Sequence, residues 1–361
     1  MPAAPEHPAV EAWTPQAPPP PQRRIGPGLV ASLIALLLVF GMVGLVAARQ
    51  AGVARSGAGS PEAAASGLLA ALDRDSLDAQ ALDRAARYLT GEERLLVSTE
   101  AGRIARLAAN PPAGQDALGI VGLGARDVRF QRVGGSDGVV VLEALSGTVR
   151  LRSSGGGTLE LSLDEARRRL AQQTNSRVTS LRVVTLRAGG RWYVALLPTM
   201  LEWSRLAVAG GPADYAKLTA AARPGAASPE AAVGALLQRL RRPLADIVAT
   251  VAPSERNAFD AFFPALKGSQ GWPAGPDGRF GLPQAGTARV GPVTRTERVA
   301  DGIVRVHFDY RPRLGGPGMP VEPPVPAPSV IAVQRNGTWY PSMVFTLVDA
   351  TLTSAEREQH S

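Results

Sequence analysis

One apolar run restricts the architecture of this chain more than any other feature. Ile25–Ala48 contains no charged residue, and Arg23-Arg24 and Arg49 stand directly outside it. A helix rises about 1.5 Å per residue, so about 20 apolar residues cross the hydrocarbon core of a bilayer. The run therefore predicts one transmembrane helix whose partner is the lipid bilayer. No second run of this kind follows, so the chain is expected to cross the membrane once.

The fate and direction of this segment follow from its length and its flanks. Val46-Ala47-Ala48 has the small residues of a cleavage site, so removal as a signal peptide stays an alternative. Signal peptides have an apolar core of about 7–15 residues, and this longer run favours an uncleaved anchor. Basic residues balance across it, with Arg23-Arg24 before and Arg49 and Arg55 after, so charge does not fix the orientation. The short tail before the span favours a cytoplasmic N-terminus and extracytoplasmic C-terminal domains in the cell membrane.

The composition bears on possible partners. Lys and Arg number 39 against 31 Asp and Glu, and every basic residue except Lys217 and Lys267 is Arg. This basic balance is compatible with anionic cell-wall polymers or lipid head groups. No basic run typical of nucleic-acid-binding tails occurs, so nucleic acid is not expected as a partner. The absence of cysteine excludes disulfides, cysteine nucleophiles and cysteine metal sites.

The part after the span carries an internal repeat. Ser60-Pro61-Glu62-Ala63-Ala64 recurs at 228–232, Glu93-Arg94 recurs at 255–256, and Trp192-Tyr193 recurs at 339–340. Each Ser-Pro-Glu start predicts a helix, because Ser caps free N–H groups, Pro suits the first helical position, and Glu faces the positive dipole end. We therefore expect two copies of one unit.

The repeat sets the expected division of the chain. The predicted segments, in order, are a disordered Pro-rich cytoplasmic tail 1–24, the span 25–48, a linker 49–59, domain one 60–208, a linker 209–227, domain two 228–350 and a polar tail 351–361. Proline-rich and glycine-rich composition marks the tail and the second linker.

Within each copy, helices are expected first and strands afterwards. For copy one the predicted helices are 61–72, 77–88, 91–108 and a short one from Ser162 to about 173, and the strands are 126–133, 138–145, 148–152, 158–162, 178–187 and 191–197. For copy two the helices are 229–240, 243–251 and 254–266, and the strands are 288–298, 303–311, 329–335 and 338–347. Thr90-x-x-Glu93 predicts a capping box at the third helix.

Helices packed on a curved antiparallel sheet make an α+β fold. The element order, the Ser-Pro-Glu-Ala-Ala helix start and the Gly190-Arg191-Trp192-Tyr193-Val194 strand resemble tandem domains of the nuclear transport factor 2-like (cystatin-like) superfamily. More narrowly, the chain resembles single-pass membrane proteins of actinobacteria with two such domains. The resemblance implies two cystatin-like domains behind one transmembrane helix. Enzymes of that superfamily place an acid or a His at the mouth of a pocket, whereas other members bind ligands without chemistry.

One strand offers a weak candidate for catalysis. Alternate residues of the expected strand 303–311 share a face, and one face carries Arg305, His307 and Asp309. His307 could act as a general base oriented by Asp309. A charge ladder that stabilises the strand by cross-strand pairing is the simpler interpretation, because one strand supplies no pocket. A single His in the folded part also makes no metal site, and no phosphate-binding or dinucleotide motif occurs, so no cofactor is expected.

The sequence thus favours a non-catalytic binding or scaffold protein of the bacterial cell envelope, with protein partners there. Residues that recur in both copies are capping, core and turn residues, which indicates a fold kept for its surface. The alternative is a small-ligand-binding protein or weak enzyme with a pocket in domain two near His307.

Overall fold

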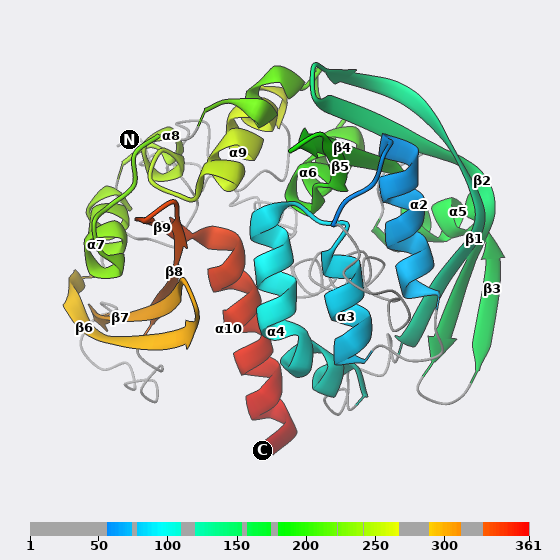
Figure 1. Cartoon of the computed structure of the whole chain (residues 1–361). Helices are drawn as coiled ribbons and strands as arrows, with labels where there is room; N and C mark the ends of the chain where they lie inside the picture. Colours follow the sequence, from blue (N-terminus) through cyan, green and yellow to red (C-terminus); the bar gives the residue numbers. More distant parts are fainter. Residues whose placement is uncertain are drawn as a thin grey trace, which may run out of the picture.

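The computed structural model describes residues 56–73, 78–109, 120–153, 157–174, 180–221, 223–240, 242–266, 289–311 and 328–360 (Figure 1). The predicted span Ile25–Ala48 and the tail 1–24 lie outside these ranges. Among the described residues, no helix combines the length and apolarity that crossing a membrane requires.

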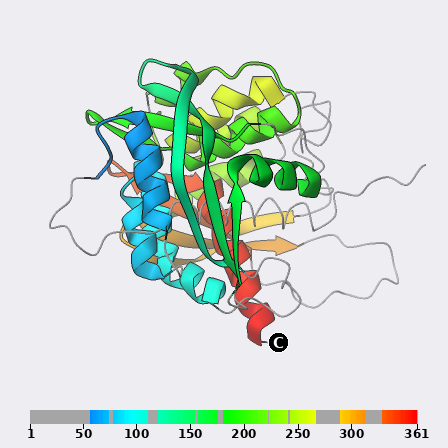
Figure 2. The same cartoon turned by 90° about the vertical axis from the view of Figure 1, so that its right-hand side faces the viewer.

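The first copy contains five helices and five strands among the described residues. They are α2 Pro61–Leu72, α3 Ala79–Ala86, α4 Gly91–Ala109, β1 Ile120–Ser136, β2 Val139–Ser153, β3 Thr158–Ser162, α5 Leu163–Thr174, β4 Arg182–Ala188, β5 Arg191–Val194 and α6 Leu196–Ala207. The strands form an antiparallel sheet in the order β1-β2-β4-β5, and β3 pairs with the far end of β2. Figure 2 shows α2 lying along the long strands of this sheet.

The second copy repeats this plan with fewer elements. After the short 3-10 helix η2 Tyr215–Thr219 come α7 Pro229–Arg239, α8 Leu244–Val248, α9 Pro253–Leu266, β6 Arg289–Ala300, β7 Ile303–Arg311, β8 Ser329–Arg335, β9 Thr338–Ser342 and α10 Met343–His360. The sheet order β6-β7-β8-β9 matches β1-β2-β4-β5, so β3 and α5 are the additions of copy one. The expected α+β architecture with curled antiparallel sheets is confirmed.

The predicted helix starts are confirmed in both copies. Ser60 Oγ accepts a hydrogen bond from Ala63 N at 3.1 Å, and Ser228 Oγ accepts one from Ala231 N at 3.2 Å. A proline occupies the first helical turn in each case. The same local chemistry therefore starts each copy, as the repeated pentapeptide indicated.

Both copies end in a helix that the sequence analysis did not predict. Residues 343–360, expected to finish a strand and form a polar tail, make the single helix α10, and α6 follows β5 in the same way. Ser342 caps α10 by accepting a hydrogen bond from Phe345 N at 3.1 Å. The helix continues because Phe345, Val348 and Leu352 follow helical spacing and pack into shared cores.

Two other local expectations were wrong. The expected strands 138–145 and 148–152 are one continuous strand, β2. The break in regular pairing falls in the partner strand β1, where Asp127 has a φ of 54°. Gly147 of β2 lies opposite this break, and its φ of 146°, which glycine adopts readily, lets β2 continue as a strand. Thr90 and Glu93 do not form the reciprocal capping box either. The Thr90 hydroxyl donates to Glu93, whose carboxylate is turned toward another helix.

The two copies share one core. Phe262 of α9 is fully buried beside Val141 of β2, Val184 of β4 and Leu201 of α6, so a copy-two helix covers the copy-one sheet. Leu96 of α4 in turn packs with apolar residues of the copy-two sheet. Figure 1 shows α4 and α10 side by side between the two sheets. The copies are therefore interlocked, because each third helix contributes to the core of the other copy.

Candidate functional site

The predicted catalytic face lies on β7, where its polar side chains form a ladder with neighbouring elements. His307 Nε2 lies 3.4 Å from Glu297 Oε2 and 3.3 Å from Arg295 Nη2, both on β6. Arg305 donates to both carboxylate oxygens of Asp349 on α10, at 3.1 and 2.8 Å, and pairs with Glu297 at 3.0 Å. This arrangement agrees with the charge-ladder interpretation.

Asp309 stands beside the neighbouring strand rather than in a cavity wall. A Cβ added at Gly291 of β6 would lie 2.8 Å from the Asp309 Cβ, so the two backbones are closely apposed there. The strand therefore brings Arg305 to α10 and His307 to β6, and none of the three candidate residues lines the cavity between α4, α6, α9 and α10.

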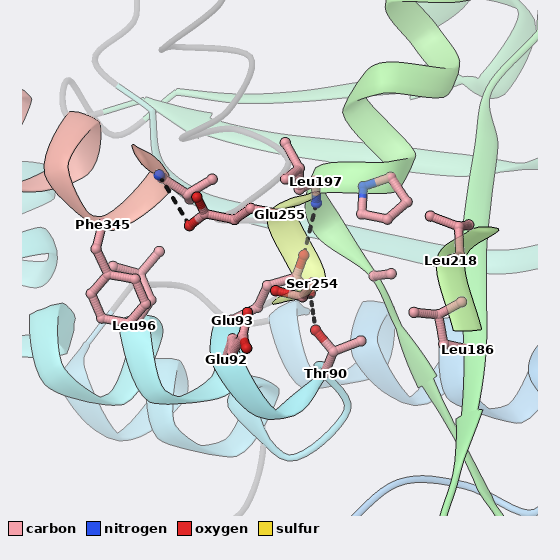
Figure 3. A pocket seen from close by; sticks show the side chains of 13 residues that line it. Thr90, Glu92, Glu93, Leu96, Leu186, Leu197, Leu218, Ser254, Glu255 and Phe345 are labelled. Atoms are coloured by element: carbon pink, nitrogen blue, oxygen red, sulfur yellow. Dashed lines mark hydrogen bonds between the residues drawn. The ribbon is translucent and has the colours of Figure 1, made fainter. Parts of the chain in front are cut away.

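A cavity does form at another place, between the two copies (Figure 3). Its volume is about 40 Å³, enough for one or a few water molecules. It is lined from α4 and the residue before it by Thr90, Glu92, Glu93 and Leu96, from α6 and its surroundings by Leu186, Ala195, Leu197, Pro198 and Leu218, from α9 by Ser254 and Glu255, and from α10 by Val344 and Phe345.

Glu93 holds the start of α6 from this cavity. Its Oε1 accepts a hydrogen bond from Leu197 N at 2.8 Å, and its Oε2 accepts one from the Thr90 hydroxyl at 2.7 Å. Leu197 is the second residue of α6, so its N–H has no partner within the helix. The side chain thus caps a helix that begins over 100 residues later in the chain.

Glu255 does the same for α10 in copy two. Its Oε2 accepts a hydrogen bond from Met343 N at 2.8 Å, and its Oε1 accepts one from Val344 N at 3.2 Å and another from the Ser342 hydroxyl. Glu255 is only 4% exposed. The pairing of Glu93-Arg94 with Glu255-Arg256 seen in the sequence is therefore a pairing of equivalent structural carboxylates.

Burial raises the pKa values of these acids. Loss of solvent raises the pKa of Glu255 to about 8, although the Ser342 hydroxyl and two backbone N–H groups act in the opposite direction, and nearby Glu92 raises it further. Burial also raises the pKa values of Glu93 and Glu92. Arg335 of β8 approaches Glu92 to 3.4 Å and, together with Arg256, opposes the rise in the pKa of Glu92.

A second repeated set was missed in the sequence. Leu196-Leu197-Pro198-Thr199-Met200-Leu201-Glu202 aligns with Met343-Val344-Phe345-Thr346-Leu347-Val348-Asp349. Each threonine hydroxyl donates to the carbonyl four residues earlier at 2.6 Å and accepts a strand N–H, from Val184 or Ile331, at 2.9 Å. In both copies a Thr, and an acidic residue three positions later, follow the Trp-Tyr pair at the same spacing. This repeated pattern could have indicated the last helix of each copy.

The acids that end these segments are buried and paired with arginine. Glu202, fully buried, accepts from Arg182 at 2.9 Å and Arg205 at 2.6 Å. Asp349 accepts from Arg103 of α4 at 2.7 Å as well as from Arg305. The second pairing joins the copies, because Arg103 and Asp349 come from different ones.

The chemistry of the cavity is that of helix capping. Its acids accept hydrogen bonds from backbone N–H and hydroxyl groups, and its volume of about 40 Å³ is that of one or a few water molecules. Within the described part of the chain, no group of three or more acidic, His or Cys side chains is arranged to hold a metal ion.

No protein-family model, curated protein or solved structure matches this chain.

Proposed function

We propose that this chain is a membrane-anchored binding or scaffold protein of the bacterial cell envelope, without catalytic activity. Ile25–Ala48 would hold it in the cell membrane, with the N-terminus in the cytoplasm and both copies outside. The curled sheets covered by helices support the narrower inference that each copy is a cystatin-like domain of the nuclear transport factor 2-like superfamily.

One observation carries the proposal. Glu93 with Glu255 and Thr199 with Thr346 are among the polar residues that the two copies have in common, and all four satisfy backbone groups of their own fold. A duplicated active site would instead repeat polar groups that lack such partners and face a cavity. Duplication has therefore preserved the packing of the two copies, which leaves their outer surfaces for partners.

The contacts of His307 support this function over the alternative of a small-ligand pocket. His307 and Arg305 are engaged by Glu297 and Asp349, and Arg305 contributes to the contact with α10. A ligand competing for these groups would have to replace partners that the fold already supplies.

Crosslinking in intact cells tests the proposal. The full chain carrying a tag after Ser361 is crosslinked, purified and analysed by mass spectrometry. We expect an adduct with a second envelope protein. A control chain with a cleavable signal peptide in place of residues 1–48 should lose the adduct if anchoring positions the partner. Recovery of monomer alone from both chains would contradict a scaffold function.

Three further measurements separate the other interpretations. A topology reporter fused after Ser361 should be active only outside the cytoplasm, and cytosolic activity would contradict the proposed orientation. Binding to anionic wall polymer should fall steeply with salt if charge drives it. For the small-ligand alternative, His307→Ala should abolish a ligand-dependent rise in melting temperature, whereas the scaffold proposal expects no such rise in the parent chain.

A further inference from the structure

Arg256 is a buried cation that the described fold leaves without a partner. It is the fourth residue of α9 and is only 3% exposed. Among the described residues, no carboxylate forms an ion pair with its guanidinium and no acceptor takes a hydrogen bond from it. A guanidinium has five N–H donors, and buried charges in proteins are normally paired and hydrogen-bonded. Arg256 therefore has free donors for a group from outside the chain.

Solvent reaches these donors through a small area. The guanidinium nitrogens of Arg256 are not among the buried side-chain atoms that lack a partner, so the 3% of the residue that is exposed includes them. An area this small admits one compact group.

Backbone hydrogen bonds place Arg256 beside strand β9. Arg256 N donates to the Ala252 carbonyl at 2.9 Å, and Ala252 N donates to the Pro341 carbonyl of β9, also at 2.9 Å. Tyr340, the residue before Pro341, is 6% exposed, and its hydroxyl donates to the Arg223 carbonyl at 2.7 Å. Arg223 and Arg256 thus approach the same part of β9.

The segment that joins the two copies is also tied to α9. Asn257, next to Arg256, donates from its side-chain amide to the Ala220 carbonyl of this segment at 2.8 Å. Residues 220 and 223 are three apart, so their Cα atoms are at most about 11 Å from each other. Arg223 is exposed and, within the described part of the chain, forms no ion pair. The fold therefore brings two unpaired arginines to one junction of α9, β9 and the joining segment.

The charge balance at this junction is positive. The pKa of Arg256 is lowered, first by burial and then by the like charge of Arg223. Opposite influences come from Asp260, Tyr340 and Glu92. Asp260 is exposed and forms no ion pair with Arg256, and Glu92 is approached by Arg335. An anion bound between the two arginines would remove their repulsion.

We propose that Arg256 and Arg223 form a binding site for the phosphate group of a small ligand. Arg256 holds two phosphate oxygens through its planar guanidinium, and Arg223 approaches the group from the solvent side. Two positive charges match a phosphate monoester, which carries a charge of about −1.5 to −2 at neutral pH. This site goes beyond the scaffold function, and it does not depend on the membrane anchor.

Thermal unfolding of the purified full chain tests the site. Sodium phosphate replaces sodium chloride up to about 20 mM, near neutral pH and at constant ionic strength, so that charge screening does not change. We expect the melting temperature to rise by about 2 °C or more and to saturate, because phosphate binds the folded state. Sodium acetate under the same conditions should give less than half of that rise. No saturating rise with phosphate, or an equal rise with acetate, would overturn the proposal.

Three variants locate the binding. Arg256→Gln should abolish the rise, and a rise that persists in the folded variant would be a general salt effect and would refute the site. Arg223→Gln removes an exposed cation, so it should fold, and it should raise the phosphate concentration at half the maximal rise at least about fivefold. This variant decides the matter if Arg256→Gln does not fold.

Arg242→Gln is the matched control. It removes another exposed cation of copy two and should leave the rise as in the parent. An unchanged half-rise concentration in Arg223→Gln, or the same increase in Arg242→Gln, would contradict a site made by these two arginines.

Discussion

Glu93 and Glu255 perform the same task in the two copies, because each reaches from the third helix to a free N–H group in the first turn of the last helix. The distances are equal at 2.8 Å, from Glu93 to Leu197 N and from Glu255 to Met343 N. A carboxylate suits this position, since helix N-termini present unpaired N–H groups and a positive dipole end. The repeat therefore preserves a long-range cap, and the copies differ in which hydroxyl assists it.

The paired threonines should be equally important in both copies. Thr199→Val removes a buried hydroxyl and Thr346→Val a half-buried one, and each hydroxyl bonds a strand N–H, so each variant should lower the free energy of unfolding by about 1–3 kcal/mol. Urea denaturation measures this loss. Thr351→Val is the matched control, because its hydroxyl bonds only the Leu347 carbonyl on the exposed side of α10, and it should change stability by under about 0.5 kcal/mol. Equal losses of stability in all three variants would contradict the structural role of the Thr199 and Thr346 hydroxyls.

Arg103 should be the most sensitive charged residue at the contact between copies. It donates to Asp349 at 2.7 Å, to Glu356 at 2.9 Å and to Thr353 at 2.9 Å. Arg103→Met removes one of the two arginines that pair with the buried Asp349 carboxylate. The free energy of unfolding, measured by chemical denaturation, should therefore fall by about 3–5 kcal/mol.

A surface pair provides the control for that variant. Arg298 pairs with Asp301 through side chains that are 74% and 94% exposed, so Arg298→Met should leave stability within about 0.5 kcal/mol of the parent. A similar loss in both variants would mean that burial does not govern these ion pairs.

The two copies should unfold together. Phe262 of copy two is fully buried among copy-one residues, so Phe262→Ala should destabilise the chain by about 3–5 kcal/mol. Because the core is shared, variants that retain either Trp203 or Trp339 as a fluorescence probe should report the same midpoint. Two separate midpoints, with only the copy-two probe affected by Phe262→Ala, would show that the copies fold independently.

His307 should matter less than its neighbour Arg305. His307 touches Glu297 and Arg295, whose side chains are 45% and 68% exposed, so His307→Gln should change the free energy of unfolding by under about 1 kcal/mol. Arg305→Met should cost more, because Arg305 compensates Asp349, which is 6% exposed. Differential scanning calorimetry compares the two, and the reverse order would indicate that His307 has the structural role.

Local chemistry accounts for the elements that the sequence predicted well. The helix Pro61–Leu72 was expected with the correct ends because Ser60, the following proline and the apolar spacing all act within one turn. Strand Ile303–Arg311 was equally clear, because alternation and flanking turn residues are local properties. The interpretation of Thr90 and Glu93 as a capping box failed, since its pattern is local but the actual partner of Glu93 is not.

The sequence by itself determined the duplication, the helix starts at Ser60 and Ser228, and the order of helices and strands up to the last helix of each copy. Only the tertiary structure decided that α9 would cover the sheet of copy one, that α4 would help cover the sheet of copy two, and that Glu93 and Glu255 would meet at one cavity. The physical reason is that apolar burial is non-directional: a hydrophobic stripe specifies that a helix is covered, not which copy covers it. Shape complementarity between the two copies determines which helix packs on which sheet. The pKa values of Glu93 and Glu255 are raised only in the packed structure, because that packing buries both side chains.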